Sequence, residues 1–99
     1  MIETRVIRYR TKIESVEENV RLIEAVFAEL AELETPGIRY EALRLNDGVT
    51  FIHIATLDGD SNPLGASPAF AAFQSGIGAR LEEGPYPATA TIVGSHGVA

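Results

Sequence analysis

A histidine interrupts an apolar run near the middle of the chain. The stretch VTFIHIATL, residues 49–57, is rich in β-branched residues and is typical of a strand that packs inside the protein. Imidazole has an unperturbed pKa of about 6.5, so His53 can exchange a proton near neutral pH. Beside Tyr40 in an apolar pocket, His53 has what a general base needs, with Tyr40 orienting the substrate. The two residues are therefore the candidate catalytic pair.

The same histidine also fits a structural role. A neutral core histidine, hydrogen-bonded to a backbone carbonyl or to Tyr40, gives the same pattern, since an unpaired buried polar group costs about 1–3 kcal/mol. The residues leave both roles open for His53. Tyr9 is expected to be a core aromatic side chain, and His96, close to the C-terminus, has no assigned role.

Composition narrows the class of protein. The chain has 99 residues, which fit one domain spanning residues 1–99. It has no cysteine, so disulfides, thiolate nucleophiles and zinc–cysteine sites are excluded. A formal net charge of −6 argues against nucleic-acid binding, which needs clustered basic residues. The many glutamates of residues 14–34 have no histidine or aspartate at ligand spacing, so we expect no metal site.

The chain has no segment that suits a membrane. No apolar run approaches the roughly 20 residues that cross a bilayer, and the first ten residues lack the apolar region of a signal peptide. We therefore expect a cytoplasmic protein with no membrane contact.

The first third of the chain predicts a strand and a helix. Residues 2–11 alternate between charged and β-branched or aromatic residues, which indicates a strand. Residues 13–34 carry apolar side chains at three- and four-residue spacing, which indicates an amphipathic helix. Ser15 and Glu18 have the spacing of a capping box, which places the helix start near residue 15. The TPG sequence at 35–37 ends the helix.

A hairpin follows over residues 38–57. Asp47–Gly48 lies between two β-rich runs and predicts a two-residue type I′ turn. That turn sets a register in which Ala42 lies opposite His53 and Tyr40 opposite Ala55.

The last third predicts a second helix and a short strand. Residues 67–83 read as a helix with Ser67 as N-cap and Pro68 at the first helical position. GPYP at 84–87 breaks the chain, and residues 88–95 form the final strand. The order β-α-β-β-α-β indicates an α+β, ferredoxin-like domain: a four-stranded antiparallel sheet with both helices on one face.

The hairpin register gives the sheet two different faces. His53, Tyr40, Phe51 and Leu57 share the face that we assign to the helices. Ile52 and Ile54, with Leu43 and Leu45, lie on the other face, which a second copy of the chain can cover. We therefore expect a homodimer that pairs through this sheet face.

The segment SPAFAAF at 67–73 carries a family resemblance. It resembles the S-P-H-F-x-x-F opening of the second helix in antibiotic-biosynthesis monooxygenase-like proteins, members of the dimeric α/β-barrel superfamily, and the element order and length are similar too. The resemblance implies a dimeric barrel with a small-molecule pocket between sheet and helices in each subunit. Characterised relatives include cofactor-independent monooxygenases of polyketide-derived phenols and haem-degrading enzymes.

The chain departs from the family at several positions. Ala69 replaces the histidine of the motif, so a role that rests on this histidine does not carry over. Gln74 stands at the position comparable to the iron-ligating histidine of haem-degrading relatives, and the chain has no tryptophan. We expect no haem and no other cofactor.

The pocket that the resemblance implies would hold a small apolar or aromatic ligand. Its expected walls are Phe51, Leu57, Phe70, Phe73 and Gln74. A plain core position is the alternative for the phenylalanines, and a solvent-facing one for Gln74.

Two functions stay open from the sequence: a cofactor-independent oxygenase acting on a small aromatic or polyketide-like molecule, and a non-catalytic dimer that binds an apolar ligand or supports another protein. An isomerase or dehydratase is a third possibility, as some barrel relatives are.

Overall fold

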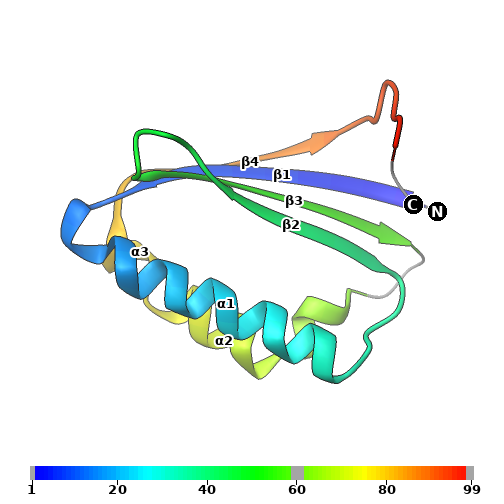
Figure 1. The fold of residues 1–99 in the computed structure, drawn as a ribbon, viewed down its shortest axis with the longest axis horizontal. Helices are drawn as coiled ribbons and strands as arrows, with labels where there is room; N and C mark the ends of the chain where they lie inside the picture. The colour runs from blue at the N-terminus through cyan, green and yellow to red at the C-terminus, as the bar shows by residue number, and fades with distance from the viewer. Residues whose placement is uncertain (1, 59–61, 98–99) are drawn as a thin grey trace.

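The fold is an antiparallel sheet covered by helices on one side. The computed structural model describes residues 2–58 and 62–97. Its four strands lie in the order β2-β3-β1-β4 (Figure 1). The central strands are β1 (Ile2–Thr11) and β3 (Thr50–Asp58), and the edge strands are β2 (Ile38–Arg44) and β4 (Leu81–Ala90). This topology confirms the predicted α+β, ferredoxin-like fold.

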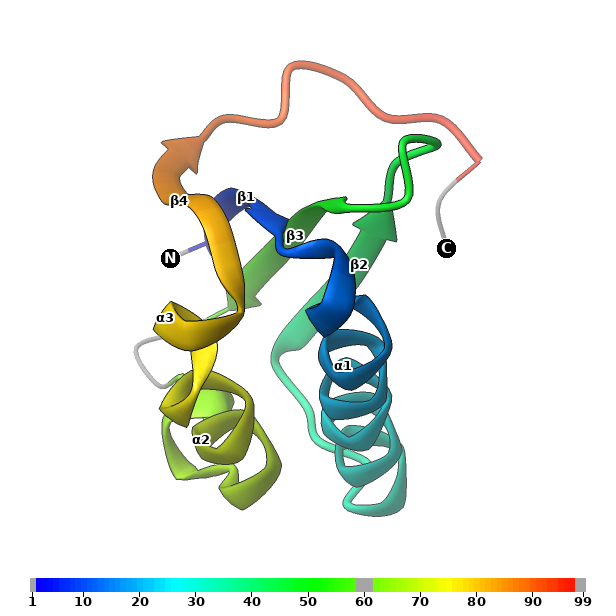
Figure 2. The same ribbon diagram turned by 90° about the vertical axis from the view of Figure 1, so that its left-hand side faces the viewer.

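Two long helical segments form the second layer. A short 3-10 turn, η1 (Ile13–Ser15), leads into α1 (Val16–Glu32), and η2 (Pro63–Ala66) leads into α2 (Pro68–Ser75), which is followed by α3 (Ile77–Arg80). Figure 2 shows α1 and α2 side by side beneath the sheet. None of the helices within the described ranges is long and apolar enough to cross a membrane.

The core lies between the helices and the helical face of the sheet. Its buried side chains come from every layer: Tyr9, Val16, Ile23, Val26, Phe51, Leu64 and Phe73. Burying each large apolar side chain contributes about 1.5–3 kcal/mol, so this cluster supplies much of the stability of a domain of this size.

The hairpin has the predicted register but a different turn. Tyr40 pairs with Ala55 and Ala42 with His53, as expected. The type I′ turn is wrong, because only Gly48 has positive φ, at 81°. The loop instead has four residues, 46–49, closed by a hydrogen bond from the Leu45 amide to the Thr50 carbonyl. Four- and two-residue loops with the same centre give the same register, so the faces are unchanged.

The carboxylate of Asp47 organises this turn. It accepts hydrogen bonds from the amides of Val49 and Thr50, both at 2.9 Å, and from the Thr50 hydroxyl at 2.5 Å. These three bonds lower the pKa of Asp47, because they favour its charged form.

The start of α1 is placed correctly but the predicted capping box is absent. Ser15 has helical φ and ψ, and its side chain makes no capping hydrogen bond. The reason is the 3-10 turn over Ile13–Ser15, which brings Ser15 into the helix before its hydroxyl can cap it.

The second helix is shorter than predicted and the last strand begins earlier. The helical segment breaks at Gly76 and ends at Arg80, so residues 81–83 belong to β4 and not to a helix. β4 continues through Pro85 and Pro87 and ends at Ala90, while 91–97 have no regular structure. Proline is tolerated there because β4 is an edge strand with one unpaired side.

A cross-helix contact fixes the start of α2. The Ser67 hydroxyl accepts a hydrogen bond from the Phe70 amide at 3.0 Å, which confirms the predicted N-cap. The same hydroxyl donates to the carboxylate of Glu29 on α1, which also accepts from the Ala69 amide at 3.4 Å. A carboxylate at a helix N-terminus is electrostatically favourable, so this contact ties α2 to α1.

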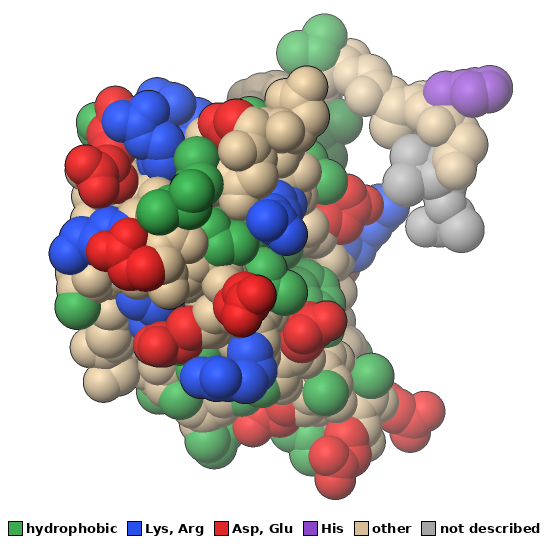
Figure 3. Space-filling view, turned by 60° about the vertical axis from the view of Figure 1, so that its left-hand side comes forward, with side chains coloured by type: hydrophobic (Ala, Val, Ile, Leu, Met, Phe, Trp, Pro, Cys, Tyr) green, Lys and Arg blue, Asp and Glu red, His purple; other side chains and the backbone are tan. Residues whose placement is uncertain are grey.

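The sheet face opposite the helices has no second layer of secondary structure in the described residues. Ile52 and Ile54 lie half-buried there, and Leu43 is 41% exposed. Residues 91–97 run across this side of the sheet (Figure 2), and Ile92 and Ser95 border a hollow of about 400 Å³ against β2 and β3. Figure 3 shows this segment standing away from the body, and acidic and basic side chains mixed over the face in view.

Gly84 allows β4 to lie directly against β1, and we predict that Gly84→Ala destabilises the protein by about 1–3 kcal/mol. Its φ is 94°, and an added Cβ would lie 3.0 Å from the Arg8 carbonyl oxygen and 3.1 Å from Tyr9 Cβ. Urea denaturation measures the change. Gly78→Ala is the matched control, because an added Cβ meets nothing within 4 Å and φ is ordinary there. Equal stability of the two variants would contradict the prediction.

Candidate functional site

Both ring nitrogens of His53 are hydrogen-bonded to tyrosines. The Tyr40 hydroxyl lies 2.7 Å from Nδ1, and the Tyr9 hydroxyl lies 2.7 Å from Nε2. His53 is on β3, between Tyr40 on β2 and Tyr9 on β1, and all three side chains point to the helical layer. The predicted pairing of His53 with Tyr40 is therefore present, and Tyr9 is a second partner.

The polar contacts continue from Tyr9 to a buried arginine. The Asn19 amide donates from Nδ2 to the Tyr9 hydroxyl at 2.9 Å. Arg80 donates from Nε to Asn19 Oδ1 at 3.1 Å and from Nη2 to the Phe73 carbonyl at 2.6 Å. We call the series Arg80, Asn19, Tyr9, His53 and Tyr40 the polar chain.

Most of the polar chain is inaccessible to solvent. The exposed fraction is 0% for Asn19, 2% for Tyr9, 3% for Arg80 and 6% for His53. In residues 2–58 and 62–97, no buried side-chain nitrogen or oxygen is without a hydrogen-bond partner. Such full pairing is what makes a polar series tolerable in a small core.

Burial controls the protonation of the polar chain. It lowers the pKa of His53 to about 4, and it raises the pKa of Tyr40, with a further contribution from Tyr9. It also raises the pKa of Tyr9 to about 12, although the Asn19 hydrogen bond and the Arg80 charge oppose this. At neutral pH His53 is therefore uncharged and both tyrosines keep their protons.

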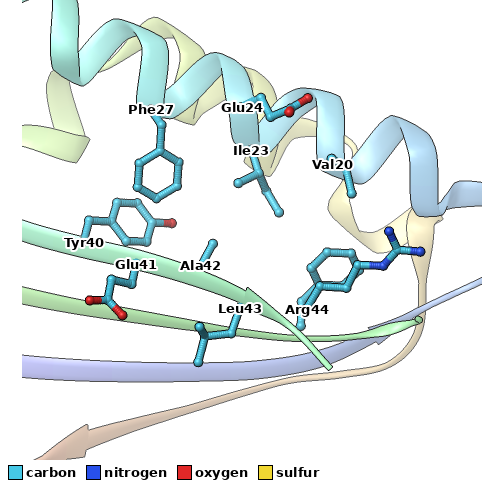
Figure 4. A pocket seen from close by; sticks show the side chains of 10 residues that line it. Val20, Ile23, Glu24, Phe27, Tyr40, Glu41, Ala42, Leu43 and Arg44 are labelled. Atoms are coloured by element: carbon cyan, nitrogen blue, oxygen red, sulfur yellow. The ribbon is translucent and has the colours of Figure 1, made fainter. Parts of the chain in front are cut away.

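A cavity of about 510 Å³ lies beside the polar chain, between α1 and β2 (Figure 4). Its walls are mainly apolar, and Tyr40 closes one end with its hydroxyl directed into the space below α1 (Figure 4). The lining residues are Val20, Ile23, Glu24, Phe27, Tyr40, Glu41, Ala42, Leu43, Arg44 and Phe51. The cavity opens to solvent, with Glu24 and Arg44 exposed.

Only part of the predicted site borders this cavity. Tyr40 and Phe51 line it, whereas Leu57, Phe70 and Phe73 are not among its walls. Leu57 and Phe73 are buried and Phe70 is half-buried against the core, which is the alternative that the sequence left open for the phenylalanines. Gln74 is exposed on α2, because it follows Phe73 and therefore points about 100° away from it around the helix axis.

His53 lies behind Tyr40 and not in the cavity wall. A base that acts on a ligand needs a free nitrogen within hydrogen-bond reach, and both nitrogens of His53 are taken by tyrosines. His53 can therefore influence a ligand in the cavity only through the Tyr40 hydroxyl. The imidazole itself does not border the cavity, and the role of His53 as a general base stays a prediction.

Sequence reasoning missed Asn19 and Arg80, and it placed Tyr9 in the core without its link to His53. A signal for Asn19 was present: it lies three residues after Val16 and four before Ile23, on the apolar side of α1. A signal for Arg80 was present too: in the predicted helix it lies seven residues after Phe73 and three after Ile77, on the apolar side.

The comparisons with known proteins identify the fold. No family model and no curated protein matches the sequence. The structure is similar to a variant of SnoaB, a cofactor-independent oxygenase from Streptomyces nogalater, with a TM-score of 0.71, 21% identity, and 98% of each chain covered. It is also similar to Rv0793 from Mycobacterium tuberculosis, with a TM-score of 0.76, 13% identity, and coverage of 96% of this chain and 98% of that one.

A protein from Nitrosomonas europaea, named as a candidate antibiotic biosynthesis monooxygenase, has a TM-score of 0.76, 9% identity, and coverage of 93% of this chain and 90% of that one. These similarities extend over nearly the whole chain. They confirm that the protein has the ferredoxin-like fold of antibiotic-biosynthesis monooxygenase-like proteins, which the resemblance in the sequence implied.

The lowered pKa of His53 makes stability depend on pH. The unfolded chain binds a proton near pH 6.5 and the folded chain only near pH 4, so stability is complete above pH 6.5 and falls as the pH drops towards 4. We predict a loss of about 3 kcal/mol over this window. Urea denaturation at several pH values measures it.

His96 provides the control for this prediction, because it lies on the exposed C-terminal segment. His53→Phe is expected to flatten the pH dependence between 6.5 and 4, and His96→Gln to leave it as in the wild type. A wild-type stability that does not change over this window would contradict the prediction.

Proposed function

We propose that the protein is a cofactor-independent oxygenase that acts on a small aromatic or polyketide-like molecule bound in the cavity between α1 and β2. The observation that carries the proposal is a tyrosine hydroxyl, backed by a buried histidine, at the end of an apolar cavity. The fold that the chain shares with SnoaB, described as a cofactor-independent oxygenase, supports it.

The cavity suits a ligand of two or three fused rings. Its volume of about 510 Å³ falls in the range of roughly 300–1,000 Å³ that small-molecule sites occupy. Phe27 and Tyr40 form an aromatic wall, with ring centroids 4.9 Å apart and planes inclined by 41°. Flat rings can pack against this wall, with a polar substituent at the Tyr40 hydroxyl.

The chemistry needs one hydrogen-bond donor at the right place. A cyclic ketone such as an anthrone loses a proton from its methylene group to become an electron-rich enolate, and the proton leaves to water at the open mouth. Tyr40 donates to the oxygen that gains negative charge, and His53 holds Tyr40 through Nδ1. The anion then reduces dioxygen: one oxygen atom becomes the new ring carbonyl, and the other leaves as water with the two methylene hydrogens.

The test is oxygen consumption and product formation with a panel of anthrones and hydroquinones. We expect wild-type turnover, and a loss on the order of 10²-fold in Tyr40→Phe, which keeps the ring and removes the donor. His53→Ala is expected to lose activity as well, because it removes the support of Tyr40. Tyr86→Phe is the matched control, since Tyr86 is exposed on β4.

Activity that survives in both Tyr40→Phe and His53→Ala would remove these residues from the mechanism. A wild-type protein that consumes no oxygen with any member of the panel would contradict the oxygenase proposal.

A non-catalytic ligand-binding dimer is the second candidate. The observation that favours it is the complete pairing of His53, whose two nitrogens are used by Tyr9 and Tyr40, as in a structural histidine. Ligand binding in the cavity without oxygen consumption would favour this function over the first. A cytoplasmic location stays a prediction for both.

We also propose that the open sheet face pairs with a second copy of the chain. It carries Leu43 and Leu45, which are 41% and 38% exposed, together with Ile52 and Ile54. An apolar face that receives a partner avoids this exposure. Pairing of identical faces about a two-fold axis gives a closed dimer.

Sedimentation at micromolar concentration tests the dimer. Ile52→Glu places a charge on the open face and is expected to yield monomers. Ile13→Glu is the matched control: Ile13 is 80% exposed in η1, ahead of α1, so the same change there should leave the dimer intact. A wild-type protein that is a stable monomer would contradict the proposal.

A further inference from the structure

We infer that Arg80 fixes which group donates and which accepts in each hydrogen bond of the polar chain. As a result, Tyr40 presents its hydroxyl proton to the cavity. The site therefore takes ligands with a hydrogen-bond acceptor, such as a ketone or quinone oxygen. This inference rests on the proposed function for the location of the ligand. Beyond that function, it specifies that the ligand must offer a hydrogen-bond acceptor, and it assigns Arg80 and Asn19 as positioning residues.

The direction begins at the guanidinium. Arginine has donors and no acceptor, so the Asn19 atom 3.1 Å from Arg80 Nε must be the amide oxygen. The Asn19 amide nitrogen therefore faces Tyr9, at 2.9 Å from the hydroxyl. An amide nitrogen only donates, so the Tyr9 oxygen accepts this bond.

The next step concerns the Tyr9 proton. In the part of the chain that the structure describes, the Tyr9 hydroxyl has two partners, Asn19 Nδ2 and His53 Nε2. Asn19 cannot accept, so the proton of Tyr9 goes to Nε2. In the reverse arrangement Nε2 would donate to Tyr9, and the hydroxyl proton of a side chain that is 2% exposed would have no acceptor.

The tautomer of His53 follows. Nε2 accepts, and the neutral ring carries one proton, so this proton is on Nδ1. Nδ1 then donates to the Tyr40 oxygen 2.7 Å away. Tyr40 keeps its own proton, and within residues 2–58 and 62–97 no other side chain hydrogen-bonds to its hydroxyl.

The consequence for a ligand is selectivity for an acceptor. The Tyr40 hydroxyl points into the space that the cavity encloses (Figure 4). It receives a hydrogen bond from His53, which strengthens it as a donor in turn. A ligand carbonyl oxygen within hydrogen-bond distance of the Tyr40 hydroxyl would accept its proton and become the last acceptor of the polar chain.

Nitrogen-15 NMR of histidine-labelled protein tests the direction without any ligand. We expect the His53 ring to show a protonated Nδ1 and an unprotonated Nε2 at neutral pH, opposite to the tautomer that free histidine favours. A ring protonated at Nε2 would overturn the inference.

Asn19→Asp is the sharpest variant, because it changes one group of almost the same shape. A carboxylate accepts on both oxygens, so Asp would bind Arg80 with one and take the Tyr9 proton with the other. Tyr9 would then accept from Nε2, and Tyr40 would give its proton to Nδ1. We expect the His53 tautomer to invert, and an unchanged tautomer in the folded variant would overturn the inference.

Asn46→Asp is the control for added charge, since Asn46 is exposed in the hairpin loop. We expect its His53 spectrum to match the wild type. If the His53 tautomer also inverted in Asn46→Asp, the added charge, and not the hydrogen-bond direction in the polar chain, would set the tautomer. That result would overturn the inference.

A pair of ligands tests the acceptor preference: 1-tetralone, whose ketone only accepts, and tetralin, which lacks the oxygen. We expect the wild type to bind tetralone about tenfold more tightly than tetralin, as for one gained hydrogen bond. The ratio should fall to about one in Tyr40→Phe and in Asn19→Asp. Equal binding of the two ligands by the wild type would overturn the acceptor preference.

The failure of this inference is distinguishable from failure of the proposed function. A protonated Nδ1 with no oxygen consumption would support the inferred hydrogen-bond direction in the polar chain and contradict the oxygenase proposal. Oxygen consumption with a protonated Nε2 would support the oxygenase proposal and contradict the inferred direction.

Discussion

The charge of Arg80 is the constraint on which the rest of the site depends. A buried guanidinium is tolerated only when its donors are paired. Arg80 meets this condition with the Asn19 side chain, the Phe73 carbonyl and the Phe73 ring, whose centroid is 5.2 Å from the guanidinium carbon. These contacts join α3 to α1 and α2, so the orientation of Asn19 and of everything after it follows from how the helices pack.

The polar chain also explains how a histidine is held in so small a core. Within the described residues each fully buried polar side-chain atom has a partner, and the aromatic rings of Tyr9, Tyr40 and Phe73 surround His53 at centroid distances of 5.2–5.8 Å. This closed environment fixes the imidazole in one place and lowers its pKa. Because His53 is enclosed, the member of the polar chain that can contact a ligand is Tyr40, which lines the cavity.

The sheet separates two roles. Its helical face carries Tyr9, His53 and Tyr40 of the polar chain and one wall of the cavity, and its open face carries the apolar side chains that we propose for pairing. The hairpin register assigns each side chain to its face, because side chains alternate along a strand. The cavity lies at the β2 edge, so its opening and the open face meet along the same strand.

The sequence by itself determined the element order, the hairpin register and the face on which His53 lies, because these depend on local patterns of apolar residues and on the position of one turn. It also placed Tyr40 beside His53, since that pair is fixed within one hairpin. It failed at residues 81–87, which belong to β4 and not to a helix end and a break, and at 91–95, which lie beyond the end of β4. The polar chain joins residues of β1, α1, β2, β3 and α3, up to 71 positions apart in sequence (Tyr9 to Arg80). Only the tertiary structure decided it, because which buried polar groups meet depends on how the helices pack against the sheet.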